Sequence, residues 1–317
     1  MKQNFLICSL LVAAMLLVPL IVMKYGEEKP EGVDMVFTAD DEMISVIKTA
    51  NGRVDTLTAK DYIIGVLAAE IDFDYHDEAL KAQAVAAYTY ARYMRKNGAS
   101  EEFNGAHISD DPGIHQGYLD IEERKEKWGD KFQDNEQKAG EIADAVAGKM
   151  IYYDNKPILA VYHNLNSGKT ESAYTVWKKD IPYLKQVESP GDRLCADYIT
   201  KVELSYDEFG SLIGKIDGVK LHKDKTKWIG DAEKTQSGYV LNVEICSGKV
   251  SSLDFRNALG LNSCCFDIKS NEDEVEITVK GNGHMVGMSQ YGADYMARQG
   301  SDYEEILKNY YSNVEIR

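Results

Sequence analysis

The chain is poor in positive charge. Its 317 residues carry 36 Lys and Arg against 52 Asp and Glu, which gives a formal net charge of −16. Nucleic-acid binding needs a basic face, so this balance argues against a nucleic-acid-binding protein. An uncharged or sparsely charged substrate such as a glycan suits it better. There is also no C-x-x-C pair to indicate a zinc ribbon, and no internal repeat or low-complexity tract.

The balance of hydrophobic and charged residues favours a folded protein with a packed core. Hydrophobic residues make up 44% and charged residues 28%, so a core is expected and disorder is not. The length allows one large domain or two small ones. Cys8 falls in an N-terminal apolar run, whereas Cys195, Cys246, Cys264 and Cys265 fall outside it, where disulfides are possible. Four cysteines allow three pairings, although a bond between the adjacent Cys264 and Cys265 would be strained.

The N-terminal apolar run covers residues 5–23 without a charge. It is close to the roughly 20 residues that cross a bilayer as a helix, and no small-x-small cleavage site follows it. We therefore expect an uncleaved membrane anchor over 1–24, a polar spacer over 25–33 and one domain outside the cytoplasm over 34–317. A signal peptide that is removed after all is the alternative. Basic residues flank both sides of the run, so charge asymmetry does not set the orientation.

Local patterns predict helices first and hairpins later. Thr58 is placed to cap a helix over 59–69, and an alanine-rich pattern predicts a second helix over about 78–96. A third helix is expected over 136–147. The polar, acidic stretch between the second and third helices, residues 98–128, is expected to be a long surface excursion.

Antiparallel hairpins are predicted at three places with turn residues between apolar runs. Asn51-Gly52 is a type I′ turn signal, and Asp154-Asn155 and Ser247-Gly248 mark two further turns. The strands flanking the later turns are expected over 150–153 with 158–163, and over 239–245 with 250–255. Another alternating strand over 274–279 leads into a glycine-rich run. Helices at both ends with hairpins between them indicate an α+β fold.

Glu70 is the sharpest candidate for chemistry. It lies at the C-terminal end of the first predicted helix, among alanines and near Ile71 and Phe73. The negative pole of the helix dipole and the apolar neighbours both disfavour the charged carboxylate and raise its pKa. A carboxyl that stays protonated nearer neutrality is what acid cleavage of a glycosidic bond requires. A solvated glutamate at a helix end is the alternative. Asp72 and Asp74 are either a second carboxylate or polar turn residues.

The second candidate region is the run from Gly283 to Ala293, with the sequence GHMVGMSQYGA. Interior glycines cost a helix roughly 1 kcal/mol each relative to alanine, so the run predicts a tight loop that brings backbone close to a neighbour. An amphipathic helix ended by Gly300 is expected to follow.

Sugars need directional hydrogen bonds to their hydroxyl and acetamido groups. The side chains we expect to supply substrate contacts come from the second predicted helix and from this run: Lys81, Gln83, Tyr88, Arg92, His284, Ser289, Gln290 and Tyr291. Alternatively, Lys81 and Gln83 occupy an exposed helix face, and His284 and Tyr291 hold the glycine loop together.

The glycine run resembles the closing signature of the sporulation stage II protein D family. Glu70 followed by residues 78–87, EALKAQAVAA, is similar to another signature of that family, in which the glutamate is the proposed catalytic acid. Further stretches that resemble family blocks are residues 65–89, 162–192, 256–266 and 283–311. The likeness therefore covers most of the chain beyond the apolar run.

The resemblance implies a peptidoglycan lytic transglycosylase, a lyase that acts on peptide-stripped glycan strands while the forespore is engulfed. One carboxylic acid suffices for that reaction, unlike a glycosidase with an acid and a nucleophile. The resemblance also implies a single-pass protein of the mother-cell membrane facing the intermembrane space. Its implied partners are a peptide-stripping amidase and a multi-spanning membrane protein. No cofactor is expected.

The chain departs from the family pattern in several places. Asp72 replaces the usual proline and Tyr88 the usual arginine, although Arg92 lies one turn later on the same face and is placed to supply a cation. Some members hold zinc with two cysteines and two histidines after the alanine-rich helix. Here that segment has His107 and His115 without cysteine. Two histidines do not make a closed four-ligand site, so no metal is expected.

Two other functions remain open. The same family domain resembles amidase enhancers, so a non-catalytic module that binds glycan or stimulates a hydrolase is one alternative. A scaffold that ties a wall-degrading complex to the membrane is another. Glu70→Gln distinguishes catalysis from both, because only a transglycosylase needs the carboxyl.

Overall fold

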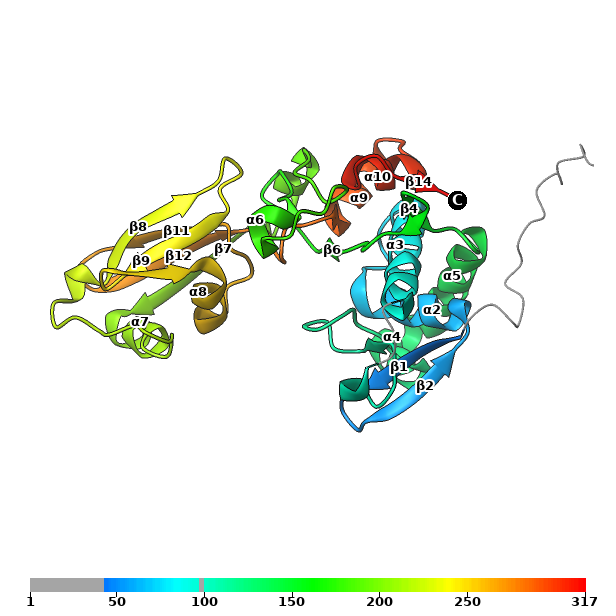
Figure 1. Ribbon diagram of the computed structural model, residues 1–317, viewed down its shortest axis with the longest axis horizontal. Coiled ribbons are helices and arrows are strands. Elements are labelled where there is room, and N and C mark those ends of the chain that lie inside the picture. The colour runs from blue at the N-terminus through cyan, green and yellow to red at the C-terminus, as the bar shows by residue number, and fades with distance from the viewer. Residues whose placement is uncertain (1–42, 97–99) are drawn as a thin grey trace, which may run out of the picture. The chain divides into compact units, whose positions relative to one another are not determined.

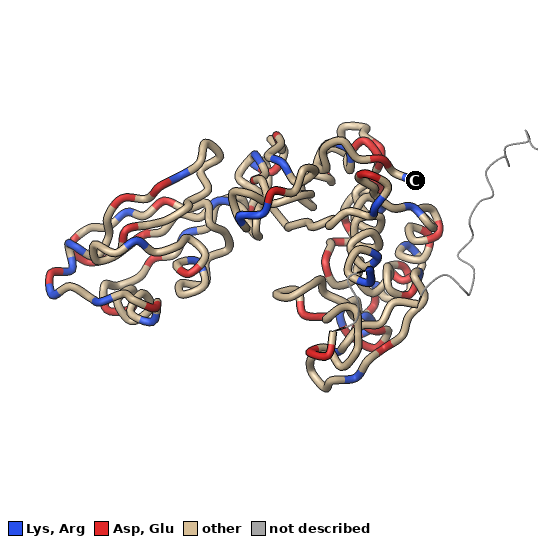
Figure 2. The backbone as a smooth tube through the Cα atoms, viewed as in Figure 1, with Lys and Arg blue, Asp and Glu red and all other residues tan. Residues whose placement is uncertain are grey.

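The computed structural model describes residues 43–96 and 100–317 (Figure 1). The expected anchor over 1–24, the spacer and Cys8 lie outside the described residues. Within the described ranges, no helix is long and apolar enough to cross a membrane. Helices and antiparallel sheets alternate along the chain, which confirms the α+β class. Asp and Glu are scattered along the whole described chain, with Lys and Arg interspersed (Figure 2).

The first sheet begins with the predicted hairpin. Strands β1 (Ile44–Lys48) and β2 (Arg53–Leu57) pair antiparallel, and β3 (Ile108–Ser109) adds parallel to β1. The two-residue turn was wrong, because Lys48 pairs with Arg53 across a four-residue loop. Gly52 has φ 73°, but Asn51 is outside the left-handed region that a type I′ turn requires at both central residues.

Three of the helices match the predicted ones closely. They are α2 (Ala59–Glu70), capped by the Thr58 side chain, α3 (Asp77–Lys96) and α5 (Phe132–Ala145). The alanines of α3 are buried and let its neighbours approach. These helices share one hydrophobic core with the C-terminal helices α9 (Gln290–Arg298) and α10 (Tyr303–Tyr310).

The predicted surface excursion over 98–128 was wrong. The segment contains a short 3-10 turn (Glu101–Phe103), β3 and helix α4 (Ile121–Trp128), and part of it packs on α2. A Cβ on Gly65 of α2 would clash with the ring of Tyr118, which is only 4% exposed. The polar composition of the segment gave no indication of this packing, because its few buried side chains are scattered among many exposed acidic ones.

The middle of the chain forms short strands. Strand β4 (Ile151–Tyr153) pairs with β5 (Lys156–Pro157) and β14 (Glu315–Ile316). The predicted strand over 158–163 is present only at its end, as β6 (Tyr162–His163), which pairs parallel with β13 (Met288–Ser289). Helix α6 (Ala173–Trp177) and a 3-10 turn (Pro190–Leu194) follow β6.

A second hydrophobic core lies between two three-stranded sheets and their helices. One sheet has the order β11 (Phe266–Ser270), β12 (Glu274–Lys280), β7 (Ile199–Ser205). The other has the order β10 (Gly248–Ser251), β9 (Val240–Ile245), β8 (Ile229–Lys234). The associated helices are α7 (Tyr206–Ile213) and α8 (Ser252–Leu259).

The predicted strand over 250–255 was therefore half wrong. Ser251 accepts a hydrogen bond from the Asp254 backbone and begins α8, so the chain turns helical where the apolar pattern continues. The strand over 274–279 is confirmed as β12. The four cysteines of the described chain are all free thiols.

Candidate active site

Glu70 lies between two pockets. It is the last residue of α2, and its side chain lines a pocket of about 370 Å³ together with Phe73, Lys127 and Trp128. It also lines a second pocket of about 340 Å³. The other lining residues of the second pocket are Tyr90, Pro112, Gly113, Ile114, His115, Gln116, Val161, Tyr162, Trp177 and His284. A chain that occupies both pockets would pass directly over the carboxyl.

Burial raises the pKa of Glu70 above its usual range. Two smaller effects oppose it: the Gly117 backbone N–H donates a hydrogen bond to Oε1, and the Lys127 ammonium lies nearby. The direction of this shift is the one expected from the sequence, and its largest cause is burial. Lys127 Nζ donates to the Ala68 carbonyl oxygen at 2.6 Å and so counters the negative end of α2.

A buried polar network backs the second pocket. Tyr162 donates to Gln116 Oε1 at 2.9 Å, and Gln116 Nε2 donates to the Tyr62 hydroxyl and to the Ala87 carbonyl oxygen. Gln116 is 3% exposed, so its side chain is fixed by these bonds. The network fixes the wall of the pocket into which Glu70 points.

Three of the predicted residues come together here. Gln290, the first residue of α9, donates from Nε2 to the Glu70 carbonyl oxygen at 3.1 Å and to Gln83 Oε1 at 3.3 Å. Gln83 and Gln290 are both buried, and Gln83 Nε2 has no partner among the described residues. These two side chains therefore help to hold the end of α2 in place. Gln83 does not lie on an exposed helix face, which was the alternative.

The glycine run is a tight loop, and the neighbour it approaches is another segment of the chain. A Cβ on Gly287 would overlap the Val161 carbonyl oxygen, and one on Gly283 would lie 2.7 Å from the His163 side chain. Ser289 donates to Asp192 Oδ1 at 2.5 Å and is fully buried. Ser289 thus caps α9 and anchors the loop.

His284 extends from this loop into the second pocket. Its ring lies against Trp177 with 5.3 Å between ring centroids, and against His163 at 5.6 Å. Burial, and secondly the charge of Arg256, lower the pKa of His284 to about 4. His284 is therefore a neutral hydrogen-bonding group at physiological pH.

Four other predicted contacts lie away from the lining of both Glu70 pockets. Lys81 is ion-paired with Glu78 at 2.7 Å. Arg92 donates to the Tyr88 hydroxyl at 2.9 Å, so the tyrosine that replaces the family's arginine contacts the arginine that was expected to supply the cation. Tyr291 is half-buried and packs edge-on against Tyr75.

His107 and His115 have separate partners. His107 Nδ1 lies 2.6 Å from the Ser45 hydroxyl, and His115 Nδ1 accepts from the Ser109 N–H at 2.9 Å. Over residues 43–96 and 100–317, no three His, Cys, Asp or Glu side chains group as metal ligands.

Sequence reasoning missed the residues that segment 98–128 contributes. Gln116, Gly117 and Lys127 all contact the end of α2 or line its pockets, yet they stand in a polar stretch without periodicity. The one local signal was Gly117 between the large residues Gln116 and Tyr118, which is typical of a close backbone approach. Trp177 had no signal of its own.

Comparison with known proteins bears on this site. Residues 48–153 match a family described as Stage II sporulation protein. Stage II sporulation protein D of Bacillus subtilis (strain 168) is 36% identical over 339 residues, covering 100% of this chain and 96% of the relative. The chain belongs to the stage II sporulation protein D family.

Two further relatives extend the comparison. Stage II sporulation protein D of Bacillus amyloliquefaciens is 38% identical over 275 residues, covering 86% of this chain and 78% of the relative. The amidase enhancer of Bacillus subtilis (strain 168) is 26% identical over 303 residues, covering 80% of this chain but 40% of the relative. The family match at 48–153 includes Glu70, Gln83 and Gly117, whereas Gln290 reaches the site from beyond it.

Proposed function

We propose that the protein is a lytic transglycosylase that cleaves the bond between N-acetylmuramic acid and N-acetylglucosamine in peptide-stripped peptidoglycan, during engulfment of the forespore. The observation that carries the proposal is the position of the Glu70 carboxyl, which is half-buried, has a raised pKa and lies where two pockets meet. A polymeric substrate needs binding sites on both sides of the catalytic group, because sugars continue on both sides of the scissile bond.

Glu70 would act first as acid and then as base. Its carboxyl proton passes to the bridging glycosidic oxygen, and the N-acetylglucosamine end leaves with that proton. The carboxylate then takes the proton of the muramoyl C6 hydroxyl, whose oxygen bonds to the anomeric carbon and closes a 1,6-anhydro ring. The raised pKa favours the first step, and the Gly117 N–H stabilises the carboxylate before the second.

One carboxyl is enough for these two reaction steps, and the site fits a mechanism with one carboxyl better than a mechanism with two. Glu70 is the single carboxylate among the residues lining the second pocket. Asp72 and Asp74 line the first pocket, but Asp72 Oδ1 accepts from the Asp74 N–H at 3.0 Å in a tight turn. Their geometry fits the polar-turn interpretation.

Turnover of peptide-free glycan strands by three proteins tests the proposal. The wild type and Asp72→Asn should both cleave, and Glu70→Gln should lose activity by at least about a thousandfold, since it holds the same shape without a transferable proton. Full activity of Glu70→Gln would overturn the proposal. Loss in Asp72→Asn as well would point to a two-carboxylate hydrolase.

The amidase enhancer is the second candidate, because a relative of that name is 26% identical over 80% of this chain. An enhancer would stimulate an amidase equally well as wild type and as Glu70→Gln. Adding each protein to a wall amidase acting on intact peptidoglycan separates the two functions.

We also propose that residues 1–24 anchor the protein in the mother-cell membrane with the rest facing the intermembrane space. An amidase that strips peptides and a multi-spanning membrane protein are the partners that fit this location. Removal of residues 1–24 should move the protein from the membrane fraction to the soluble one. Recovery of the truncated protein with membranes would contradict the anchor.

A further inference from the structure

The second pocket at Glu70 shares part of its wall with a third one. Trp177 and His284 line the second pocket on one side and a pocket of about 410 Å³ on the other. This third pocket lies between α6 and the β8–β10 sheet with α8, and the proposed reaction gives it no role. Its walls include three cationic side chains, Lys178, Lys249 and Arg256.

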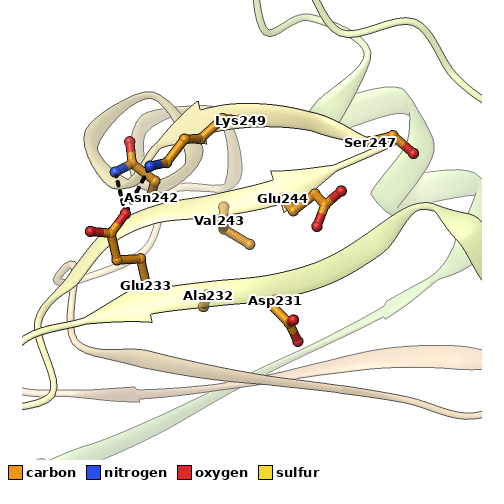
Figure 3. A pocket seen from close by; sticks show the side chains of 8 residues that line it. All are labelled: Asp231, Ala232, Glu233, Asn242, Val243, Glu244, Ser247 and Lys249. Carbon is orange, nitrogen blue, oxygen red and sulfur yellow. Dashed lines mark hydrogen bonds and ion pairs between the residues drawn. The ribbon is translucent and has the colours of Figure 1, made fainter.

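One of these cations is already neutralised. Lys249 Nζ lies 2.8 Å from Glu233 Oε2, which also accepts from Asn242 Nδ2 at 3.3 Å (Figure 3). Glu233 is the single carboxylate that lines the third pocket. The pocket therefore keeps a surplus of positive charge in a protein whose net charge is −16.

The surplus belongs to Arg256 and Lys178. Arg256 is half-buried on α8 and donates from Nε to the Leu261 carbonyl oxygen at 3.0 Å. Within the described ranges, no carboxylate lies within ion-pair distance of its guanidinium, and neither Nη atom makes a hydrogen bond. Lys178 is exposed, and Nζ donates to the Thr175 carbonyl oxygen at 3.1 Å.

We propose that Arg256, assisted by Lys178, forms a subsite for the free lactyl carboxylate of a muramoyl unit away from the cleaved bond. The inference rests on the proposed function and assigns a specificity to it. Muramic acid recurs at every second sugar, so a strand held at Glu70 carries further such carboxyls along its length. In a strand that still bears peptides, that carboxyl is a neutral amide and the site has no anion to bind.

The chemistry of the residues fits this role. A guanidinium binds a carboxylate with two parallel hydrogen bonds, and Arg256 has both terminal nitrogens available for them. The Trp177 indole, shared by both pockets, can pack against a sugar ring between the two sites. The charge of Arg256 also contributes to the lowered pKa of His284, which places the guanidinium near this shared wall.

Binding to the full-length Glu70→Gln protein tests the subsite without turnover. Titration calorimetry would compare peptide-free glycan strands, the same strands with their carboxyls converted to amides, and chitin oligosaccharides, which have no lactyl group. We expect the free-carboxylate strands to bind roughly tenfold to a hundredfold more tightly than the amidated ones, as for loss of one charge-assisted hydrogen-bonded pair.

Arg256→Gln added to this background should remove the preference, and Arg256→Lys should keep part of it, since it retains the charge without the planar fork. Thermal unfolding of each variant checks that the fold is intact. Lys178→Gln, at an exposed position, should lower the preference by a smaller factor because exposed charges are screened. A preference unchanged in Arg256→Gln and Lys178→Gln overturns the subsite.

Failure of the subsite is distinguishable from failure of the proposed function. If the wild type cleaves free and amidated strands at the same rate, the subsite is wrong and the transglycosylase stands. If the wild type cleaves neither, the proposed function fails and the subsite with it. Faster cleavage of free than of amidated strands by the wild type, with equally slow cleavage of both by Arg256→Gln, is the expected result.

Discussion

Gln290 Nε2 donates a hydrogen bond to the carbonyl oxygen of Glu70 at 3.1 Å. The bond joins the start of α9 to the end of α2, and Gln290 continues it to Gln83 Oε1 on α3. The backbone of the candidate acid is thus held by a helix that lies far away in sequence.

Gln290→Ala should leave two acceptors without a donor, the buried Gln83 Oε1 and the half-buried Glu70 carbonyl oxygen, and cost about 1–3 kcal/mol of stability. It should also lower kcat more than it raises KM, because the bond orients the end of α2. Urea unfolding and turnover check both effects. Gln299→Ala, at an exposed position just after the same helix, is the matched control. Equal stability and activity of the two variants would contradict the role of Gln290.

Gly117→Ala should impair activity with little loss of stability. A Cβ there would lie 3.0 Å from Glu70 Oε1 and 3.0 Å from the Ala69 side chain, so the carboxyl must shift. A misplaced catalytic group typically costs on the order of tenfold to a hundredfold in rate. Gly140→Ala in α5, where the nearest atom is 4.0 Å away, is the control that should retain full activity. An active Gly117→Ala protein would separate this contact from catalysis.

Local sequence patterns were enough for much of the fold. Thr58 and the alanine-rich helix, the turn at Asp154-Asn155 and the alternating strand before the glycine loop each predict a structure that short-range interactions favour. The prediction of a strand over 250–255 failed because the Ser251 cap starts a helix and outweighs the β propensity of Phe255 and its neighbours. A helix also buries Phe255 in the second core as well as a strand would.

The candidate site was predictable in part. Glu70, Gln83, Gln290 and His284 could be named from their residue types and the family resemblance. The structure places Glu70 and His284 in the lining of one pocket, and Gln290 hydrogen-bonds to both Glu70 and Gln83. The contribution of Gly117 could not be anticipated, because a polar segment without periodicity gives no indication of which helix it packs on. Ser289 caps α9, and its residue type does not separate a cap from the predicted substrate contact because a hydroxyl suits both sugars and helix caps.

Replacement of Glu70 should change stability with pH in a defined direction. The pKa of Glu70 is raised above its ordinary value of 4.5, so ionising it costs the folded state more than the unfolded chain. The penalty is absent well below pH 4.5, grows as the pH rises and is complete above the folded-state pKa. Glu70→Gln should therefore be more stable than wild type at pH 7 and equally stable near pH 3. Thermal unfolding at both pH values measures this, and a Glu70→Gln protein less stable than wild type at pH 7 would show that the folded state favours the charged form.

Gly287→Ala should be more damaging than Gly300→Ala. Both residues have positive φ, 72° and 101°, so alanine is strained at either by roughly 1–2 kcal/mol. At Gly287 an added Cβ would also overlap the Val161 carbonyl oxygen, whereas at Gly300 no atom lies within 4 Å of that position. The difference in unfolding free energy between the variants isolates the close approach. Equal losses would mean that the loop backbone can retreat from Val161.

The masses of the products made from peptide-free glycan strands test the central claim most directly. Wild-type protein should yield muramoyl ends lighter by one water than a hydrolysed end, and Glu70→Gln should yield none. Muramoyl ends of full mass from wild-type protein, or anhydro ends from Glu70→Gln, would contradict the account of Glu70 as the single acid and base.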